Sequence, residues 1–217
     1  MNQKILKNFL RRRLWFLVAF YQLVLAKQSY TRYTGWIESL KHGYPCSSNG
    51  SEIPWMNYPT VTFLKERLSK DLSLFEFGSG YSTLFYAQLV RVVISVEHDR
   101  SWLNLMESKM PDNVSLIHRE EDINRVYCRS ITEFDREFDV VIVDGKDRMN
   151  CVKQAIRKLS PVGVIILDDT GRKKYIEIVD YANKKGFLNL SLEGLKPNSR
   201  KVHRTTIFYR RDNCLNI

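Results

Sequence analysis

The sequence predicts an α/β fold with a mostly parallel sheet of seven strands, helices on both faces and an antiparallel strand at the C-terminal edge. Short apolar runs alternate with helical patterns between residues 60 and 185, which is typical of repeated βα units. Residues 140–143 are continuously apolar, as expected for a strand buried on both faces. The last two apolar runs have no helix between them, so we expect them to pair antiparallel.

The expected elements follow one another along the chain. Strands are expected at 72–77, 92–97, 114–118, 138–144, 164–167, 188–192 and 205–209. Helices are expected at 60–69, 84–90, 101–110, 149–159 and 173–185. Ser101 is the expected N-cap of its helix, and Pro111 follows its end.

Composition limits the domain organisation. The chain has 217 residues, enough for one α/β domain, which we place at 58–217 with an N-terminal extension at 1–57. The four cysteines are widely spaced without a C-x-x-C pair, so neither a disulfide framework nor a zinc site is expected. The net charge is +10, but residues 1–37 hold seven basic residues and no acid. The remaining chain is only mildly basic, which disfavours a nucleic-acid substrate.

A glycine-rich turn, Glu76-Phe77-Gly78-Ser79-Gly80, follows the first strand, and the second strand ends in Glu97. Glycines let backbone N–H groups approach a ligand, and an acid on the next strand can accept ribose hydroxyls. The turn differs from the dinucleotide pattern, because Thr83 stands where the third glycine would be. Glu76 would repel a pyrophosphate and attract an ammonium group. A nucleoside with a cationic tail is therefore expected.

In these residues the chain resembles the class I S-adenosylmethionine-dependent methyltransferases, over about residues 58–210. The resemblance implies a Rossmann-like fold and S-adenosyl-L-methionine as cofactor. The acceptor is not fixed by the sequence, and we expect a small molecule or a glycan or lipid-linked intermediate. Ser82 and Thr83 either contact the methionine carboxylate or only cap the next helix. His98 either lies against the adenine or is a solvated turn residue. The expected cofactor-binding residues are Glu76, Gly78, Ser79, Gly80, Ser82, Thr83, Glu97, His98 and Asp144.

Acids also follow two later strands, at Asp144 and at the Asp168-Asp169 pair. The loop 144–148 resembles the corresponding loop of the catechol and caffeoyl-type O-methyltransferases. That resemblance implies a divalent metal on Asp144, Asp168 and Asp169, with Lys146 as the base. The match is imperfect, because the loop is one residue shorter before its lysine and the acid pair is Asp-Asp. We therefore expect Asp144, Lys146 and Asp169 to be catalytic and the nucleophile to be an oxygen, and we favour no metal.

Two rival functions remain at this stage. An NAD-binding oxidoreductase could use the same topology, although Glu76 and Thr83 oppose it. The second rival is a catalytically silent domain that binds a nucleotide or a partner. Two histidines have open roles. His118, at the end of the third strand, contacts adenine or solvent, and His203 reaches the cleft or lies on the surface.

The N-terminal segment contains a nearly continuous apolar run of 13 residues, 14–26, preceded by three arginines. A bilayer-spanning helix needs about 20 residues, so this run is too short. It could lie in the membrane surface, pack on the domain or on a partner, or be a cleaved signal. Export would separate the chain from a cytoplasmic cofactor. We expect a cytoplasmic protein whose residues 1–27 contact the inner membrane surface. The aromatic residues of 53–58 either form a wall of the active site or seal the core.

Overall fold

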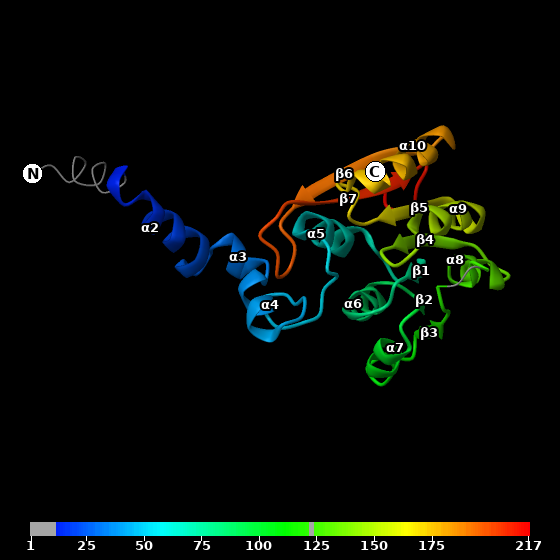
Figure 1. Cartoon of the computed structure of the whole chain (residues 1–217), viewed down its shortest axis with the longest axis horizontal. Coiled ribbons are helices and arrows are strands. Elements are labelled where there is room, and N and C mark those ends of the chain that lie inside the picture. The colour runs from blue at the N-terminus through cyan, green and yellow to red at the C-terminus, as the bar shows by residue number, and fades with distance from the viewer. Residues whose placement is uncertain (1–11, 122–123) are drawn as a thin grey trace, which may run out of the picture.

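The computed structural model describes residues 12–121 and 124–217. Its core is a seven-stranded sheet of order β3-β2-β1-β4-β5-β7-β6, with helices on both faces (Figure 1). The first five strands of the chain are parallel, and β7 runs antiparallel to both β5 and β6. The predicted fold class is therefore confirmed. The strands are β1 (Ser73–Phe77), β2 (Val92–Glu97), β3 (Val114–His118), β4 (Phe138–Val143), β5 (Leu159–Leu167), β6 (Leu188–Gly194) and β7 (His203–Tyr209).

Helices cover the sheet from both sides. Two apolar clusters divide the core: one packs α5 and α6 against the sheet, and the other packs α8, α9 and α10. The main helices are α5 (Tyr58–Arg67), α6 (Tyr81–Leu89), α7 (Arg100–Glu107), α8 (Val126–Arg129), α9 (Arg148–Lys158) and α10 (Ile176–Lys184), with short 3₁₀ turns η2 (Ser130–Glu133) and η3 (Lys173–Tyr175).

Two local predictions were wrong, and two short helices were missed. Asp99, not Ser101, caps α7, because its carboxylate accepts the backbone N–H of Trp102 at 3.0 Å. The cap therefore lies immediately after the turn that ends β2. Strand β5 begins at Leu159, five residues before the predicted start, and joins β4 through a register irregularity. The short helices α8 and η2 were not predicted, since four-residue segments show no clear apolar period.

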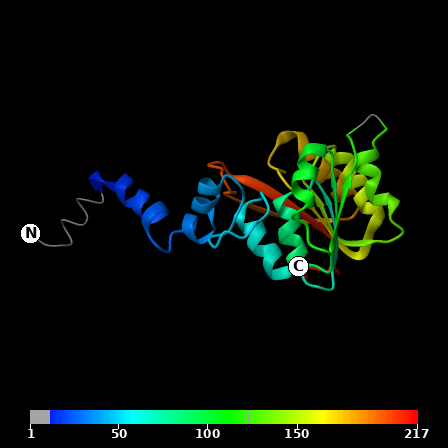
Figure 2. The same ribbon diagram turned by 90° about the horizontal axis from the view of Figure 1, so that it is seen from below.

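The N-terminal helices extend away from the sheet (Figures 1 and 2). They are α2 (Trp15–Phe20), a π-helical turn η1 (Tyr21–Leu25), α3 (Tyr30–Tyr33) and α4 (Trp36–His42). Neither α2 nor η1 contains a buried residue. Among residues 12–121 and 124–217, no helix combines the length and apolarity needed to cross a membrane.

Residues 36–58 form hydrogen bonds with residues 192–205, near the C-terminal end of the chain. The indole N–H of Trp36 donates to the carbonyl oxygen of Ser199 at 2.9 Å, and that of Trp55 donates to the carbonyl of Pro197 at 2.8 Å. The Asn57 amide bonds to strands β6 and β7. The N-terminal segment therefore holds the tip of the β6–β7 hairpin beside the carboxyl ends of the parallel strands.

Candidate active site

A cavity of about 500 Å³ lies at the carboxyl ends of the strands, around the point between β1 and β4 where the strand order reverses. This is where open α/β sheets bind ligands. Two groups of residues line it. On the β1–β2 side these are Gly78, Ser79, Gly80, Tyr81, Ser82, Glu97, His98 and Trp102. On the β4–β5 side they are Asp144, Gly145, Lys146, Arg148, Arg172, Lys174 and Tyr175. Pro45 and Trp55 of the N-terminal segment also line the cavity.

The glycine turn is fixed by close approach to the turn after β4. Gly78 has a φ of +101°, and a side chain there would meet the backbone of Gly145 at 3.0 Å. A side chain on Gly145 would in turn overlap the Tyr127 hydroxyl. Gly78 therefore serves the packing of two strand-end turns as well as lining the cavity. Substituting it would strain the fold directly.

Glu76 lies beneath the glycine turn and is completely buried. Its carboxylate accepts hydrogen bonds from the hydroxyls of Ser82 (2.5 Å), Thr83 (2.5 Å) and Ser95 (2.8 Å). Burial raises the pKa of Glu76 to about 7, although the three hydroxyls act to lower it. Glu76 and Thr83 do not line the cavity, whereas Ser82 does. The carboxylate thus organises the start of α6 from below.

Glu97 connects the end of β2 to the glycine turn. Its side chain is about 5% exposed and lines the cavity. One carboxylate oxygen accepts the backbone N–H groups of His98 and Asp99, both at 2.8 Å, and the other accepts the N–H of Ser79 at 3.1 Å. His98 also lines the cavity, with its Nδ1 2.6 Å from the Glu97 carboxylate. The other candidate, His118, bonds the carbonyl of His98 through Nε2 and does not line it.

Trp102 was missed by the sequence analysis. Its indole N–H donates to the carbonyl oxygen of Ser79 at 3.0 Å, and its ring lies beside Gly80. The tryptophan therefore forms an aromatic wall next to Glu97. The available signal was its position in the first turn of the helix that follows the acid-tipped strand.

Asp144 lines the cavity on the β4–β5 side, across from Glu97 and Trp102. Its side chain is 30% exposed, and its carboxylate accepts a hydrogen bond from Nη2 of Arg148 at 2.7 Å. Arg148 is itself nearly buried and donates to the backbone carbonyl oxygens of Asp144, Gly145 and Asp168. Burial and the neighbouring Asp168 carboxylate raise the pKa of Asp144, although Arg148 acts to lower it. Lys146 is half-exposed at the cavity rim, 3.9 Å from Glu121.

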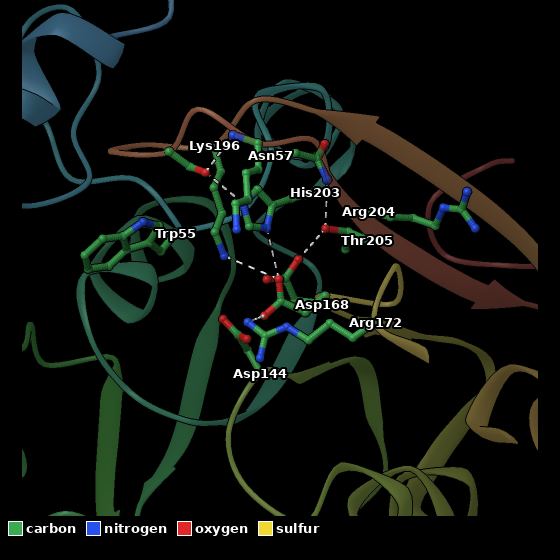
Figure 3. A network of polar contacts seen from close by, with 12 residues as sticks. Trp55, Asn57, Asp144, Asp168, Arg172, Lys196, His203, Arg204 and Thr205 are labelled. Atoms are coloured by element: carbon green, nitrogen blue, oxygen red, sulfur yellow. Dashed lines mark hydrogen bonds and ion pairs between the residues drawn. The ribbon is translucent and has the colours of Figure 1, made fainter. Parts of the chain in front are cut away.

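The Asp168-Asp169 pair lies behind this wall and does not line the cavity. Asp168 is 1% exposed. One of its oxygens accepts the hydroxyl of Thr205, the other has no partner among the described residues, and burial raises its pKa. The Asp169 carboxylate lies 2.5 Å from Arg172 and 3.4 Å from Lys196, close to His203 as well. Burial acts to raise the pKa of Asp169, but these neighbours lower it. Figure 3 shows Arg172, Lys196 and His203 pointing into this network.

These acids do not fit a divalent metal. Asp144 and Asp169 are each already paired with an arginine, Arg148 and Arg172 respectively. Within the described part of the chain, no group of three or more His, Cys, Asp or Glu side chains converges as a metal site. All four cysteines are free, as expected.

Comparison with known proteins agrees with this geometry. Residues 75–170 match the sequence pattern of a methyltransferase domain family. The fold is shared with a precorrin-6y C5,15-methyltransferase from Geobacter metallireducens (TM-score 0.54, 16% identity, 70% of this chain and 87% of that chain). Residues 75–170 are thus a methyltransferase domain with the class I, Rossmann-like fold. This match favours methyl transfer over the NAD-binding oxidoreductase and over the catalytically silent domain.

Two further structures share this methyltransferase fold. One is an rRNA methylase from Streptococcus thermophilus (TM-score 0.54, 13% identity, 70% of this chain and 95% of that chain). The other is a Streptococcus mutans protein in complex with SAH, named in its description as a methyltransferase (TM-score 0.50, 16% identity, 68% and 94%). At these identities the likeness establishes the fold and not the acceptor. No curated protein sequence matches the chain.

The cavity fits the cofactor of this methyltransferase family, S-adenosyl-L-methionine. The Glu97 carboxylate suits a ribose diol, the glycine turn lets its backbone approach a ligand closely, and Trp102 offers an aromatic face. A volume of about 500 Å³ also leaves room for part of an acceptor.

Proposed function

We propose that this methyltransferase methylates a hydroxyl oxygen of a small molecule or of a glycan or lipid-linked intermediate. The observation that carries the proposal is the Asp144 carboxylate. It lines the cavity on the side opposite Glu97, and its pKa is raised toward the neutral range. A hydroxyl must lose its proton as it attacks, and a base is most effective when its pKa is near the working pH.

Each residue of the site has a different role in this proposal. Glu97 holds the ribose hydroxyls, and the glycine turn brings its backbone against the cofactor. When bound, S-adenosyl-L-methionine supplies a methyl group on a sulfonium that is already activated toward attack. Asp144 takes the proton of the acceptor hydroxyl while Arg148 keeps the carboxylate aimed into the cavity. Lys146 positions the acceptor at the rim. Asp169 acts indirectly, by fixing Arg172 on the same wall.

Asp144→Asn tests this assignment in the full chain. Labelled S-adenosylmethionine is first presented with a panel of hydroxyl and amine compounds to find an acceptor. With a hydroxyl acceptor we expect Asp144→Asn to lower kcat by about 100-fold or more while SAH affinity stays within twofold. The wild-type rate should rise with pH through the neutral range, because the carboxylate must be ionised to accept the proton. The variant should lose that dependence.

Asp147→Asn is the matched control. Asp147 lies in the same loop, but its carboxylate bonds Asn150, and its φ of +42° suits asparagine. It should keep wild-type kinetics. Methylation of amines alone would contradict oxygen transfer. A full-activity Asp144→Asn enzyme would remove Asp144 from the chemistry.

We further propose that the N-terminal helices contact the cytoplasmic membrane surface. In α2 and η1 the aromatic residues are exposed, with Trp15 at 65% and Tyr21 at 58%. Arg12, Arg13 and Lys27 flank this run, and no acid lies near it in sequence. Aromatic side chains favour the headgroup region, and basic ones are attracted to anionic lipids. Such contact would bring the active site close to a lipid-linked acceptor. The expected contact of residues 1–11 lies outside the described residues.

A further inference from the structure

The β4–β5 wall of the cavity carries an excess of positive charge. Lys146, Arg148, Arg172 and Lys174 all line it, whereas Asp144 is the one carboxylate there among the described residues. Arg148 is committed to Asp144. Arg172 is paired with Asp169, yet its side chain is 55% exposed.

Lys174 has no acidic partner among the described residues. Its ammonium lies 4.8 Å from the centre of the Tyr175 ring. Lys146 is also weakly engaged, since Glu121 is 3.9 Å away and half-exposed. Two ammonium groups on one wall are thus available to a ligand.

This wall lies away from the nucleoside end of the site. Glu97 ends β2, whereas Lys146 follows β4 and Lys174 follows β5, on the other side of β1 in the sheet. A second cavity of about 350 Å³ shares Gly145, Lys146, Arg148, Lys174 and Tyr175 with the first. Its own lining adds three carboxylates, Glu121, Asp147 and Glu177, so the excess of positive charge belongs to the first cavity. The two lysines therefore lie where the two cavities meet, on the β4–β5 side of the site.

The cofactor adds to the imbalance. Its sulfonium is positive, so a neutral or cationic acceptor would leave several like charges close together in a confined site. A carboxylate or phosphate on the acceptor would neutralise them, and focused charge in a cleft attracts such a ligand. Trp55 and Tyr175 also line the cavity and offer flat apolar faces to the body of an acceptor.

We infer that the acceptor carries an anionic group, phosphate or carboxylate, which binds Lys174 and Lys146. The inference rests on the proposed function, since it assigns the acceptor half of the same site. It makes Lys174 a residue that determines acceptor specificity.

The test uses the full chain saturated with SAH. Glucose 6-phosphate, glucuronate and methyl glucoside serve as phosphate, carboxylate and neutral probes, and binding is followed by calorimetry or NMR titration. We expect at least one anionic probe to bind about tenfold more tightly than methyl glucoside. Lys174→Met should weaken the anionic probe about fivefold. Lys173→Met is the matched control, because Lys173 is its exposed neighbour and does not line either cavity.

Each outcome has one meaning. Phosphate binding without carboxylate binding, or the reverse, supports the inference and identifies the anion. Equal binding of the neutral probe, or equal losses in the two lysine variants, overturns it. So does a Lys174→Met variant that loses SAH affinity, because Lys174 would then hold the cofactor carboxylate. Tighter binding of a single-stranded RNA oligonucleotide than of any sugar probe would also overturn it. Failure of the wild-type chain to bind SAH would instead contradict the methyltransferase site itself.

Discussion

Replacing Glu76 by Gln should remove a large pH dependence from the stability of the protein. The Glu76 carboxyl is completely buried, and its pKa is raised from 4.5 to about 7. At about 1.4 kcal/mol for each unit of pKa, this difference corresponds to about 3 kcal/mol. About 3 kcal/mol is a large part of the roughly 5–15 kcal/mol that stabilises a typical domain.

The sign follows from proton binding. Between pH 4.5 and about 7 the folded state holds the Glu76 proton more tightly than the unfolded state does. The contribution of this group to stability is fully present below pH 4.5 and is lost as the pH rises through about 7. Glutamine at position 76 cannot ionise, so the variant lacks this loss. Any fixed cost of rearranging the three hydroxyl hydrogen bonds is the same at both pH values.

Urea unfolding at pH 4.5 and pH 8, followed by circular dichroism, measures the effect. Between pH 4.5 and pH 8, wild type should lose about 3 kcal/mol of stability that Glu76→Gln keeps. The free energy of unfolding of the variant minus that of wild type should therefore increase by about 3 kcal/mol. Glu66→Gln, an exposed change on α5, should leave the pH dependence as in wild type. A difference between Glu76→Gln and wild type that does not vary with pH would refute this account of the buried carboxyl.

Three further predictions concern the ligands. Glu97→Gln should weaken SAH binding by about 1–3 kcal/mol, because ribose hydroxyls would lose a charged partner, and unchanged affinity by calorimetry would remove Glu97 from the cofactor site. Methyl transfer should survive a chelator, whereas loss with chelation and recovery with magnesium would show that the acids bind a metal after all. The full chain should sediment with anionic vesicles at low salt and less so at high salt, and a Trp15→Ser/Phe20→Ser variant should stay in the supernatant; equal sedimentation of both chains would contradict membrane contact through α2.

The sequence predicted the elements whose signals are local. The glycine turn and Glu97 stand at fixed positions after two apolar strands, so the pattern locates them without knowledge of distant contacts. Fold class and cofactor followed from these residues. The same pattern placed Glu76 beside the ligand, because spacing shows that an acid precedes the turn but not which way its side chain points. Three neighbouring hydroxyls hold it underneath.

The rest of the site depends on pairings that spacing does not reveal. Trp55 reaches the cavity because its indole bonds Pro197, 142 residues later. Its neighbours Ile53 and Met56 are buried in the core, so the aromatic segment both lines the site and seals the core. Asp169 looked like a catalytic acid, but Lys196, from the β6–β7 connection, contributes to pairing it behind the cavity wall. Tertiary contacts between sequence-remote segments decided each of these positions.

The contacts between residues 36–58 and the β6–β7 hairpin also set the order in which the molecule can be completed during synthesis. Trp36 leaves the ribosome 163 residues before its partner Ser199. β7 lies between β5 and β6 in the sheet, so β6 cannot join until β7 has been made. The strands that carry the glycine turn and Glu97 are complete much earlier. A nascent chain thus completes the glycine turn and Glu97 early, whereas Trp36 and Trp55 find their partners only after residues 197–199 have been translated.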